Sequence, residues 1–205
     1  MDISSREAII LDLGFRKEAL PALQQYIDLL WKTNEALNLI SRKMTFDDLI
    51  DNHVIDCLLP LRHFPKNLKR AADFGSGGGL PGVIYALQFP ETEIHLFEKS
   101  NLKREFLNMC AEISPNIKVH GEIPLDLKGI ELVSARAFKA LDVILDMSRN
   151  YYNSQGKYFL LKGRREKIDE EYSLAKKKFK DLKIDIIPLK SPLLDVERHL
   201  VTIHF

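Results

Sequence analysis

Residues 73–82 read DFGSGGGLPG, and this short loop holds five of the ten glycines in the chain. Glycine readily adopts a positive φ and leaves room for another group to approach the backbone closely. The apolar run at residues 70–74 (RAADF) leads into the loop, and residues 81–88 follow it with a helical pattern. The stretch therefore predicts a turn between a strand and a helix at which a ligand lies against the backbone.

Short apolar runs alternate with amphipathic stretches from this loop to the end of the chain. The runs predict strands at 70–74, 93–98, 117–120, 131–135, 157–162, 184–188 and 199–204, and the intervening stretches predict helices at 81–88, 100–113, 138–151 and 165–181. This alternation is typical of an α/β fold with a seven-stranded, mainly parallel sheet between two helix layers. Only about ten residues with two prolines join the last two strands. Because a parallel crossover needs more, we expect an antiparallel last strand.

The part of the chain before the loop has helical periodicity instead. Within LPALQQYIDLLWKTNEALNLI, apolar residues recur on one helical stripe: Leu20, Leu23, Ile27, Leu30 and Trp31. The helical pattern continues in FDDLIDNHVIDCLLPLRHF and stops near Pro65. We therefore expect an N-terminal helical extension over 1–65, packed as one globular unit with an α/β domain over 66–205.

The composition excludes several classes of protein. With 45% hydrophobic and 29% charged residues, the 205-residue chain is typical of a soluble globular protein. Its 30 basic residues nearly balance 29 acidic ones, so any nucleic-acid contact must rest on a local patch. Cys57 and Cys110 lie in apolar helical segments without a CxxC pattern, which indicates buried thiols in a reducing compartment. No signal peptide, membrane span or metal-ligand spacing is visible, so we expect a cytoplasmic protein without a metal.

The spelling of the loop separates three classes of ligand. A P-loop ends in Gly-Lys-Ser/Thr, whereas this loop ends in GLPG. A dinucleotide loop follows GxGxxG, but Leu80 stands at the last glycine, and Pro81 lacks an amide for a pyrophosphate. S-adenosylmethionine has no phosphate and needs close approach more than helix-start amides. The loop therefore favours S-adenosylmethionine and leaves a dinucleotide as the alternative.

Two carboxylates near the loop fit that ligand. Glu98 ends the second predicted strand, near the roughly 20-residue offset at which an acid binds ribose hydroxyls. Asp73 lies at the tip of the first predicted strand. Its carboxylate is expected either to accept from the ligand's amino group and favour the positive sulfonium, or simply to cap the loop.

Several segments, in order, resemble the RsmG (GidB) family of bacterial 16S ribosomal RNA guanine-N7 methyltransferases. They are ALNLIS, NHVIDCL, DFGSGGGLPG, FEKSNLKREFL, SARAF, LLKG and ERHLV, and they span roughly residues 20 to 203. The resemblance implies a class I, Rossmann-like methyltransferase that uses S-adenosylmethionine. It also implies a cofactor site made of Gly75, Leu80, Glu98, Arg136 and, beside the adenine, Ile123 and Pro124. The loop itself adds Asp73, Gly77 and Gly79 to the expected cofactor-binding residues.

The expected reaction makes few demands on the protein. Guanine N7 carries a free lone pair, so its methylation needs alignment of N7, methyl carbon and sulfur and no general base. The chain accordingly has neither an NPPY-type loop after the fourth predicted strand nor a cysteine at a strand end. Arg136, Lys162 and Arg198 are the candidate positioning residues, because each lies at the end or the start of a predicted strand.

Ribosomal RNA, free or in the small ribosomal subunit, is the expected partner of a monomeric enzyme. The candidate RNA-binding residues flank strand ends, or follow from the resemblance: Lys162, Arg164, Arg165, Lys103, Arg104, His199, Asn38 and His53. His53 and Asp56, three apart, are expected to pair on a helix surface. The near-zero net charge keeps a same-fold methyltransferase of small molecules or proteins as an alternative. The loop alone also admits a nucleotide-binding module or an NAD enzyme.

Overall fold

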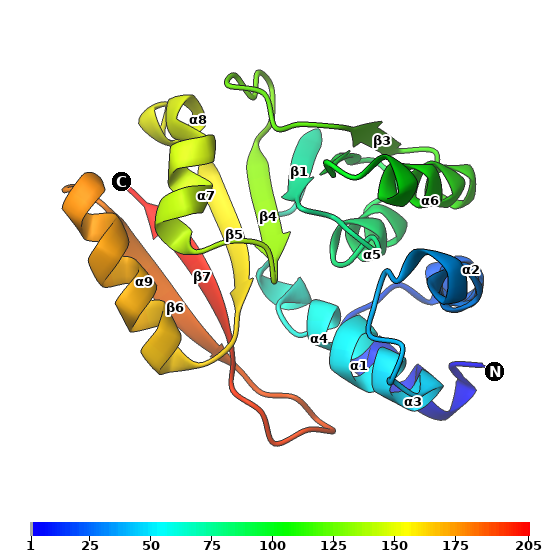
Figure 1. The fold of residues 1–205 in the computed structure, drawn as a ribbon. Coiled ribbons are helices and arrows are strands. Elements are labelled where there is room, and N and C mark those ends of the chain that lie inside the picture. The colour runs from blue at the N-terminus through cyan, green and yellow to red at the C-terminus, as the bar shows by residue number, and fades with distance from the viewer. Residues whose placement is uncertain (1) are drawn as a thin grey trace.

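Seven strands form one mixed sheet in the computed structural model, which describes residues 2–205 (Figure 1). The strands are β1 (Arg70–Phe74), β2 (Glu93–Phe97), β3 (Ile117–His120), β4 (Leu132–Arg136), β5 (Lys157–Lys162), β6 (Lys183–Leu189) and β7 (Arg198–His204). Their order across the sheet is β3-β2-β1-β4-β5-β7-β6. Neighbours from β3 to β5 are parallel, and β7 runs antiparallel to both β5 and β6. The predicted antiparallel last strand is confirmed.

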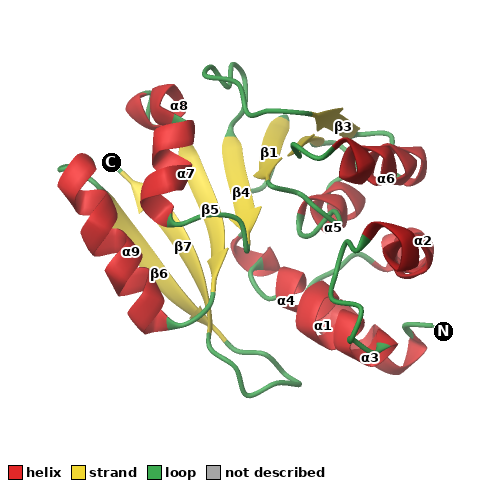
Figure 2. Cartoon of the chain, viewed as in Figure 1, coloured by secondary structure: helices red, strands yellow, loops and turns green. Residues whose placement is uncertain are grey.

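Helices cover both faces of this sheet, as the alternating pattern predicts. They are α1 (Glu7–Asp12), α2 (Leu20–Leu37), α3 (Phe46–Leu49), α4 (Ile55–Leu58), α5 (Gly82–Gln88), α6 (Asn101–Ile113), α7 (Leu141–Met147), α8 (Arg149–Asn153) and α9 (Arg165–Lys178). Figure 2 shows α7, α8 and α9 on one side, with α5, α6 and the N-terminal helices on the other. Alternate strand residues separate the two cores: Ala71 joins the α5 side and Ala72 the α7 side. The period-two alternation of β1 therefore directs its side chains alternately into the two cores.

The single helix predicted over 138–151 is wrong. The chain forms α7 and α8 instead, and Ser148 between them leaves the helical region with φ −117° and ψ 35°. Its hydroxyl donates to the carbonyl of Ile144 at 2.7 Å and shares a hydrogen bond with the Tyr158 hydroxyl at 2.8 Å. A serine that bonds to backbone and to a neighbouring strand competes with a continuous helix.

The N-terminal helices are part of the same hydrophobic core as the sheet. Leu23 and Leu30 of α2 and Cys57 of α4 belong to the apolar cluster that also contains Ala71 and Leu132 of the strands. Between α3 and α4 the chain makes a π-helical turn at Ile50–Val54. Within residues 2–205, no helix is long and apolar enough to cross a membrane.

Candidate functional site

The glycine loop connects the carboxyl end of β1 to α5 through residues with positive φ. These are Gly75 at 69°, Gly77 at 53° and Gly79 at 87°. The amides of Gly75 and Ser76 both donate to the carbonyl of Phe97, at 2.9 and 3.1 Å, which fixes the loop beside the end of β2. Left-handed backbone at three alternate positions explains why the loop needs glycine there.

Most of the loop glycines are also required by packing inside the chain. A Cβ on Gly75 would lie 2.1 Å from Cδ2 of Phe138, and one on Gly79 would lie 2.5 Å from Cγ2 of Val83. A Cβ on Gly78 would lie 3.3 Å from Leu30 of α2. Gly77 differs, because its nearest neighbour at that position is the carbonyl of Gly75, at 3.7 Å. Close approach by a ligand is therefore possible chiefly at Gly77.

Glu98 follows β2 and lies next to this open position. Its Oε2 accepts from the Gly77 amide at 3.0 Å, and its Oε1 accepts from the Ser100 amide at 2.9 Å. Ser100 in turn caps the N-terminus of α6. Each carboxylate oxygen can accept a further hydrogen bond. Glu98 thus braces the loop and still has acceptor capacity for hydroxyl groups.

Asp73 lies beneath the loop, with only 1% of its surface exposed. Its Oδ1 accepts from the Ser134 hydroxyl at 2.9 Å. Its Oδ2 accepts no hydrogen bond from any residue in 2–205 and lies 2.9 Å from where a Cβ on Gly82 would be, at the start of α5. Burial raises the pKa of Asp73 to about 6, against the lowering effect of the nearby Ser76 and Ser134 hydroxyls.

The remaining predicted cofactor residues differ in how deeply they are buried. Leu80 is buried, and Ile123 packs partly buried against the core on the α7 side. Pro124 is exposed in the segment after β3. The sequence predicted Pro81 in the first turn of the helix. In the structure Pro81 directly precedes α5, one position before that turn.

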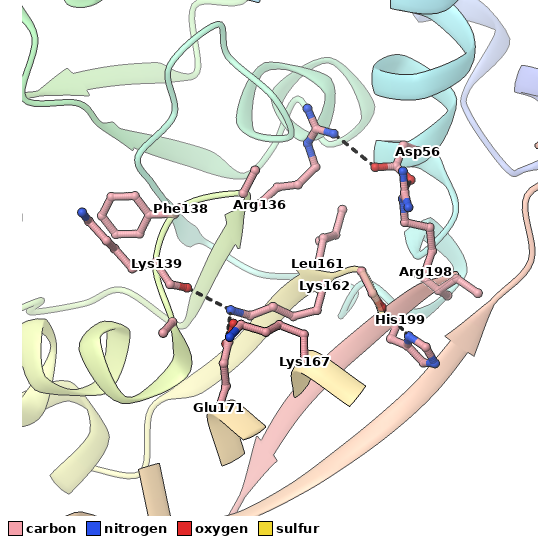
Figure 3. A pocket seen from close by; sticks show the side chains of 14 residues that line it. Asp56, Arg136, Phe138, Lys139, Leu161, Lys162, Lys167, Glu171, Arg198 and His199 are labelled. Carbon is pink, nitrogen blue, oxygen red and sulfur yellow. Dashed lines mark hydrogen bonds and ion pairs between the residues drawn. The ribbon is translucent and has the colours of Figure 1, made fainter. Parts of the chain in front are cut away.

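A cavity of about 500 Å³ opens at the carboxyl ends of β4 and β5. Figure 3 shows its polar and aromatic side chains, which come from β4, β5, β7, α4, α9 and the segment after β4. Phe138 lines this cavity and also packs on Gly75. It therefore connects the glycine loop with the cavity. The backbone of Ala137, at φ 50°, places Arg136 and Phe138 on the cavity wall.

The wall of the cavity next to α4 is a network of charges. The Asp56 carboxylate binds Arg136 through Oδ2, 3.1 Å from Nη1, and binds Arg198 through Oδ1. Arg136 Nη2 also donates to Nδ1 of His53 at 2.8 Å. Burial, reinforced by the positive charge of Arg136, lowers the pKa of His53 to about 4, so the ring is neutral at pH 7 and accepts this hydrogen bond.

This network corrects the expected surface pair of His53 and Asp56. Both residues face inward and converge on Arg136, since the helical turns of 46–58 pack against the end of β4. The side chain of Asp56 is only 10% exposed.

A second ion pair forms the wall next to α9. Lys162 Nζ donates to Oε2 of Glu171 at 2.7 Å and to the Lys139 carbonyl at 2.9 Å. The amide of Leu141 donates to the same Glu171 oxygen at 2.9 Å. Sequence reasoning missed Glu171. The available signal was its place between Ile168 and Ala175 on the buried stripe of α9.

The other candidate RNA-binding residues divide into exposed and internally bonded ones. Arg164, Arg165 and Asn38 are exposed, although Arg165 also pairs with Asp169. Arg104 donates to the carbonyls of Glu98 and Lys99, and His199 is buried with its Nδ1 2.7 Å from the Gly163 carbonyl. Lys103 is partly exposed at the start of α6.

The two cysteines lie outside this site. Cys57 and Cys110 are free and buried, as predicted, and burial raises the pKa of each thiol to about 12. Across the described part of the chain, no group of three or more His, Cys, Asp or Glu side chains could hold a metal ion.

Comparison of the fold with solved structures gives methyltransferases. The N-terminal domain of human METTL16 in complex with SAH superposes with a TM-score of 0.53 at 14% identity, over 84% of this chain and 78% of that chain. At this identity the likeness shows the fold alone, which is the predicted class I methyltransferase fold.

Comparison of sequences is more specific. A ribosomal RNA small subunit methyltransferase G 1 of Bdellovibrio bacteriovorus is 67% identical over 198 residues, covering 97% of both chains. A ribosomal RNA small subunit methyltransferase G of Brachyspira hyodysenteriae is 33% identical over 88% of both chains. Residues 19–201 match the sequence profile of the GidB family, rRNA small subunit methyltransferase G. The chain therefore belongs to the GidB family of small-subunit ribosomal RNA methyltransferases.

Proposed function

We propose that this enzyme transfers a methyl group from S-adenosylmethionine to N7 of one guanine in small-subunit ribosomal RNA, as a cytoplasmic monomer. The observation that supports this most directly is the place of Phe138. Its ring packs on Gly75 of the cofactor loop and lines the cavity of about 500 Å³ next to it. A cofactor site and an acceptor site that share one residue are close enough for direct transfer between them.

The residues around the loop fit S-adenosylmethionine. Gly77 is open on the side where a side chain would project, and Glu98 beside it keeps acceptor capacity for ribose hydroxyls. Ile123 and Pro124 would lie by the adenine, while Asp73, Gly79 and Leu80 shape the loop from beneath. When bound, S-adenosylmethionine supplies an electrophilic methyl group on a positive sulfur.

The same residues argue against a dinucleotide. A pyrophosphate needs free amides at the start of the following helix. Here the carboxylate of Asp73 lies against Gly82, the first residue of α5, with its Oδ2 otherwise without a hydrogen bond from the described residues. A buried carboxylate at that position repels phosphate, so the NAD alternative is disfavoured by charge as well as by sequence.

The cavity supplies alignment for a base whose N7 already has a lone pair. Arg136 is fixed by Asp56 and His53, so its guanidinium forms a rigid wall. Phe138 offers an aromatic face for stacking a base that leaves its helix. Because N7 carries no proton, the reaction requires no general base.

The acceptor is proposed to be RNA because of the family and of the exposed cations near the cavity. Arg164, Arg165 and Lys167 are exposed at the start of α9, and Lys167 also lines the cavity. Such side chains neutralise phosphates beside a base-binding pocket. Family membership does not favour the alternative of a small-molecule or protein acceptor.

Loss of the gene tests the proposal in the cell. Mass spectrometry of 16S ribosomal RNA from a deletion strain should show one 7-methylguanosine lost, and a plasmid copy should restore it. Unchanged ribosomal RNA would contradict the proposed acceptor. Calorimetry with the purified protein should show binding of S-adenosylmethionine, and binding of NAD alone would contradict the proposed cofactor.

A further inference from the structure

Two carboxylates, Asp56 and Glu171, line the cavity, and they differ in how their oxygens are used. Both oxygens of Asp56 bind arginines of the chain. Glu171 receives its two hydrogen bonds, from Leu141 and Lys162, on Oε2 alone. Its Oε1 accepts none from the residues described and is not enclosed like the buried, unpartnered Oδ2 of Asp73. Glu171 therefore presents a fixed acceptor that the protein itself does not use.

The position of this acceptor is set from two sides. The Leu141 amide belongs to α7, and Lys162 ends β5, so donors on separate elements hold the same carboxylate oxygen. The Glu171 side chain is only 12% exposed. A buried carboxylate that accepts two hydrogen bonds has little rotamer freedom. Oε1 is therefore preorganised to accept hydrogen bonds from a bound group.

Guanine is the base whose donors match a carboxylate best. Its N1–H and its exocyclic 2-amino group lie side by side on one edge, while O6 and N7 are acceptors. The 2-amino group lies across the base from N7. A guanine whose N7 faces the glycine loop therefore directs its 2-amino edge away from that loop.

The residues of the cavity are arranged in the same direction as these groups of guanine. Phe138 packs on Gly75 of the glycine loop, and Figure 3 shows Glu171, on α9, on a different wall of the cavity from Phe138 and Arg136. We propose that Oε1 of Glu171 accepts a hydrogen bond from the 2-amino group of the acceptor guanine and thereby selects guanine. This inference rests on the proposed function and names the residue that reads the base.

Lys162 complements this acceptor. Its ammonium group has three N–H donors, of which two are used by Glu171 and Lys139. The third can donate to an acceptor such as guanine O6, which lies between N7 and N1. The Lys162–Glu171 pair then offers one donor and one acceptor to the edge of guanine that distinguishes it from adenine.

The test removes only the 2-amino group. The methylated guanine is first mapped, and small subunits are then reconstituted with a single inosine at that position, since inosine keeps N7, O6 and N1–H. Wild-type kcat/KM should be about 10- to 100-fold lower for inosine than for guanosine, because a hydrogen bond to a charged group is lost.

Glu171→Gln should remove this discrimination. The two donors on Oε2 will hold the amide oxygen of glutamine in that place, so its NH₂ faces the donor edge of guanine. The ratio of guanosine to inosine rates should fall to within about threefold of one. Glu170→Gln is the matched control, because Glu170 is exposed on the same helix and, unlike its partner Lys167, does not line the cavity. It should keep the wild-type ratio.

The outcomes separate this inference from the proposed function. A wild-type ratio near one, or an unchanged ratio in Glu171→Gln with a lower rate on both substrates, would overturn the role of Glu171. If Glu171→Gln does not fold, as checked by circular dichroism and S-adenosylmethionine binding, a wild-type ratio near one still overturns the role of Glu171. Wild-type enzyme that fails to methylate guanosine subunits would instead overturn the proposed function.

Discussion

The carboxylate of Asp56 on α4 holds the guanidinium of Arg136 at the end of β4, with Oδ2 3.1 Å from Nη1. The two residues are 80 positions apart in the sequence. Because Asp56 also binds Arg198 of β7, one carboxylate ties the N-terminal helices to two strands of the sheet. The N-terminal segment is therefore part of the cavity wall as well as of the core.

Removing this carboxylate should destabilise the protein strongly. Asp56→Ala leaves two guanidinium groups without their counter-charge, and the loss of one partner from a largely buried ion pair costs about 3 kcal/mol. Urea unfolding at pH 7.5 measures this change. The exposed pair of Lys167 and Glu170 provides the control, since Lys167→Ala should cost less than about 1 kcal/mol. Equal losses of unfolding free energy in the two variants would show that Asp56 does not hold the N-terminal helices to the sheet.

The neutral ring of His53 should make stability sensitive to acid. Its folded pKa of about 4 lies below the ordinary value of 6.5, so its contribution is complete above pH 6.5 and is lost as the pH falls towards 4. Between pH 7.5 and 5, the wild type should lose about 1–2 kcal/mol more than His53→Gln, after discounting for partial solvent screening. Urea unfolding at the two pH values checks this, and parallel losses in both proteins would refute it.

Alanine at the open Gly77 and at the packed Gly75 should have different effects. Gly77→Ala should cost only about 1 kcal/mol of stability for its positive φ, but should weaken S-adenosylmethionine binding more than about tenfold, because the new methyl projects where the cofactor approaches. Gly75→Ala should also displace Phe138, whose ring lies 2.1 Å from the added Cβ.

Unfolding of the double variant tests the Gly75 contact, and calorimetry tests the effect of Gly77→Ala on affinity. Adding Phe138→Ala to Gly75→Ala should recover part of the stability that the single change loses, since the collision is removed. Strictly additive losses would mean that the ring does not pack on Gly75. Unchanged affinity in Gly77→Ala would place the cofactor elsewhere.

Phe138 should affect the acceptor more than the cofactor. Loss of one stacked base contact costs about 1–3 kcal/mol, so Phe138→Ala should lower kcat/KM for small subunits by about 10- to 100-fold. Phe138→Tyr should retain most activity because its ring can still stack. If S-adenosylmethionine affinity falls as much as kcat/KM in Phe138→Ala, the ring serves the cofactor loop and not the base.

Much of the fold could be predicted because it depends on local patterns. Apolar runs located every strand to within a residue at each end, and the glycine loop located the carboxyl edge of the sheet. The break between α7 and α8 could not be predicted, because the Ser148 hydroxyl is held partly by Tyr158 on the next strand. The π-helical turn at Ile50–Val54 likewise has no signal in hydrophobic periodicity.

The site was predicted less completely, for the same physical reason. Arg136 and Lys162 are visible at strand ends, but their partners Asp56 and Glu171 come from helices distant in the chain. Nothing in the sequence around Glu171 distinguishes it from the other charged residues of α9 except its place on the buried stripe. Most loop glycines are also required by packing within the chain, and Gly77 is the one with open space at its Cβ position that we propose for ligand approach.

The most direct test of the account is methyl transfer in vitro to small ribosomal subunits that lack the modification. The purified enzyme with S-adenosylmethionine labelled on its methyl group should label 16S ribosomal RNA, and nuclease digestion with mass spectrometry should give 7-methylguanosine at one position. Label in ribosomal protein, in another nucleotide, or in neither would contradict the proposed transfer to guanine N7.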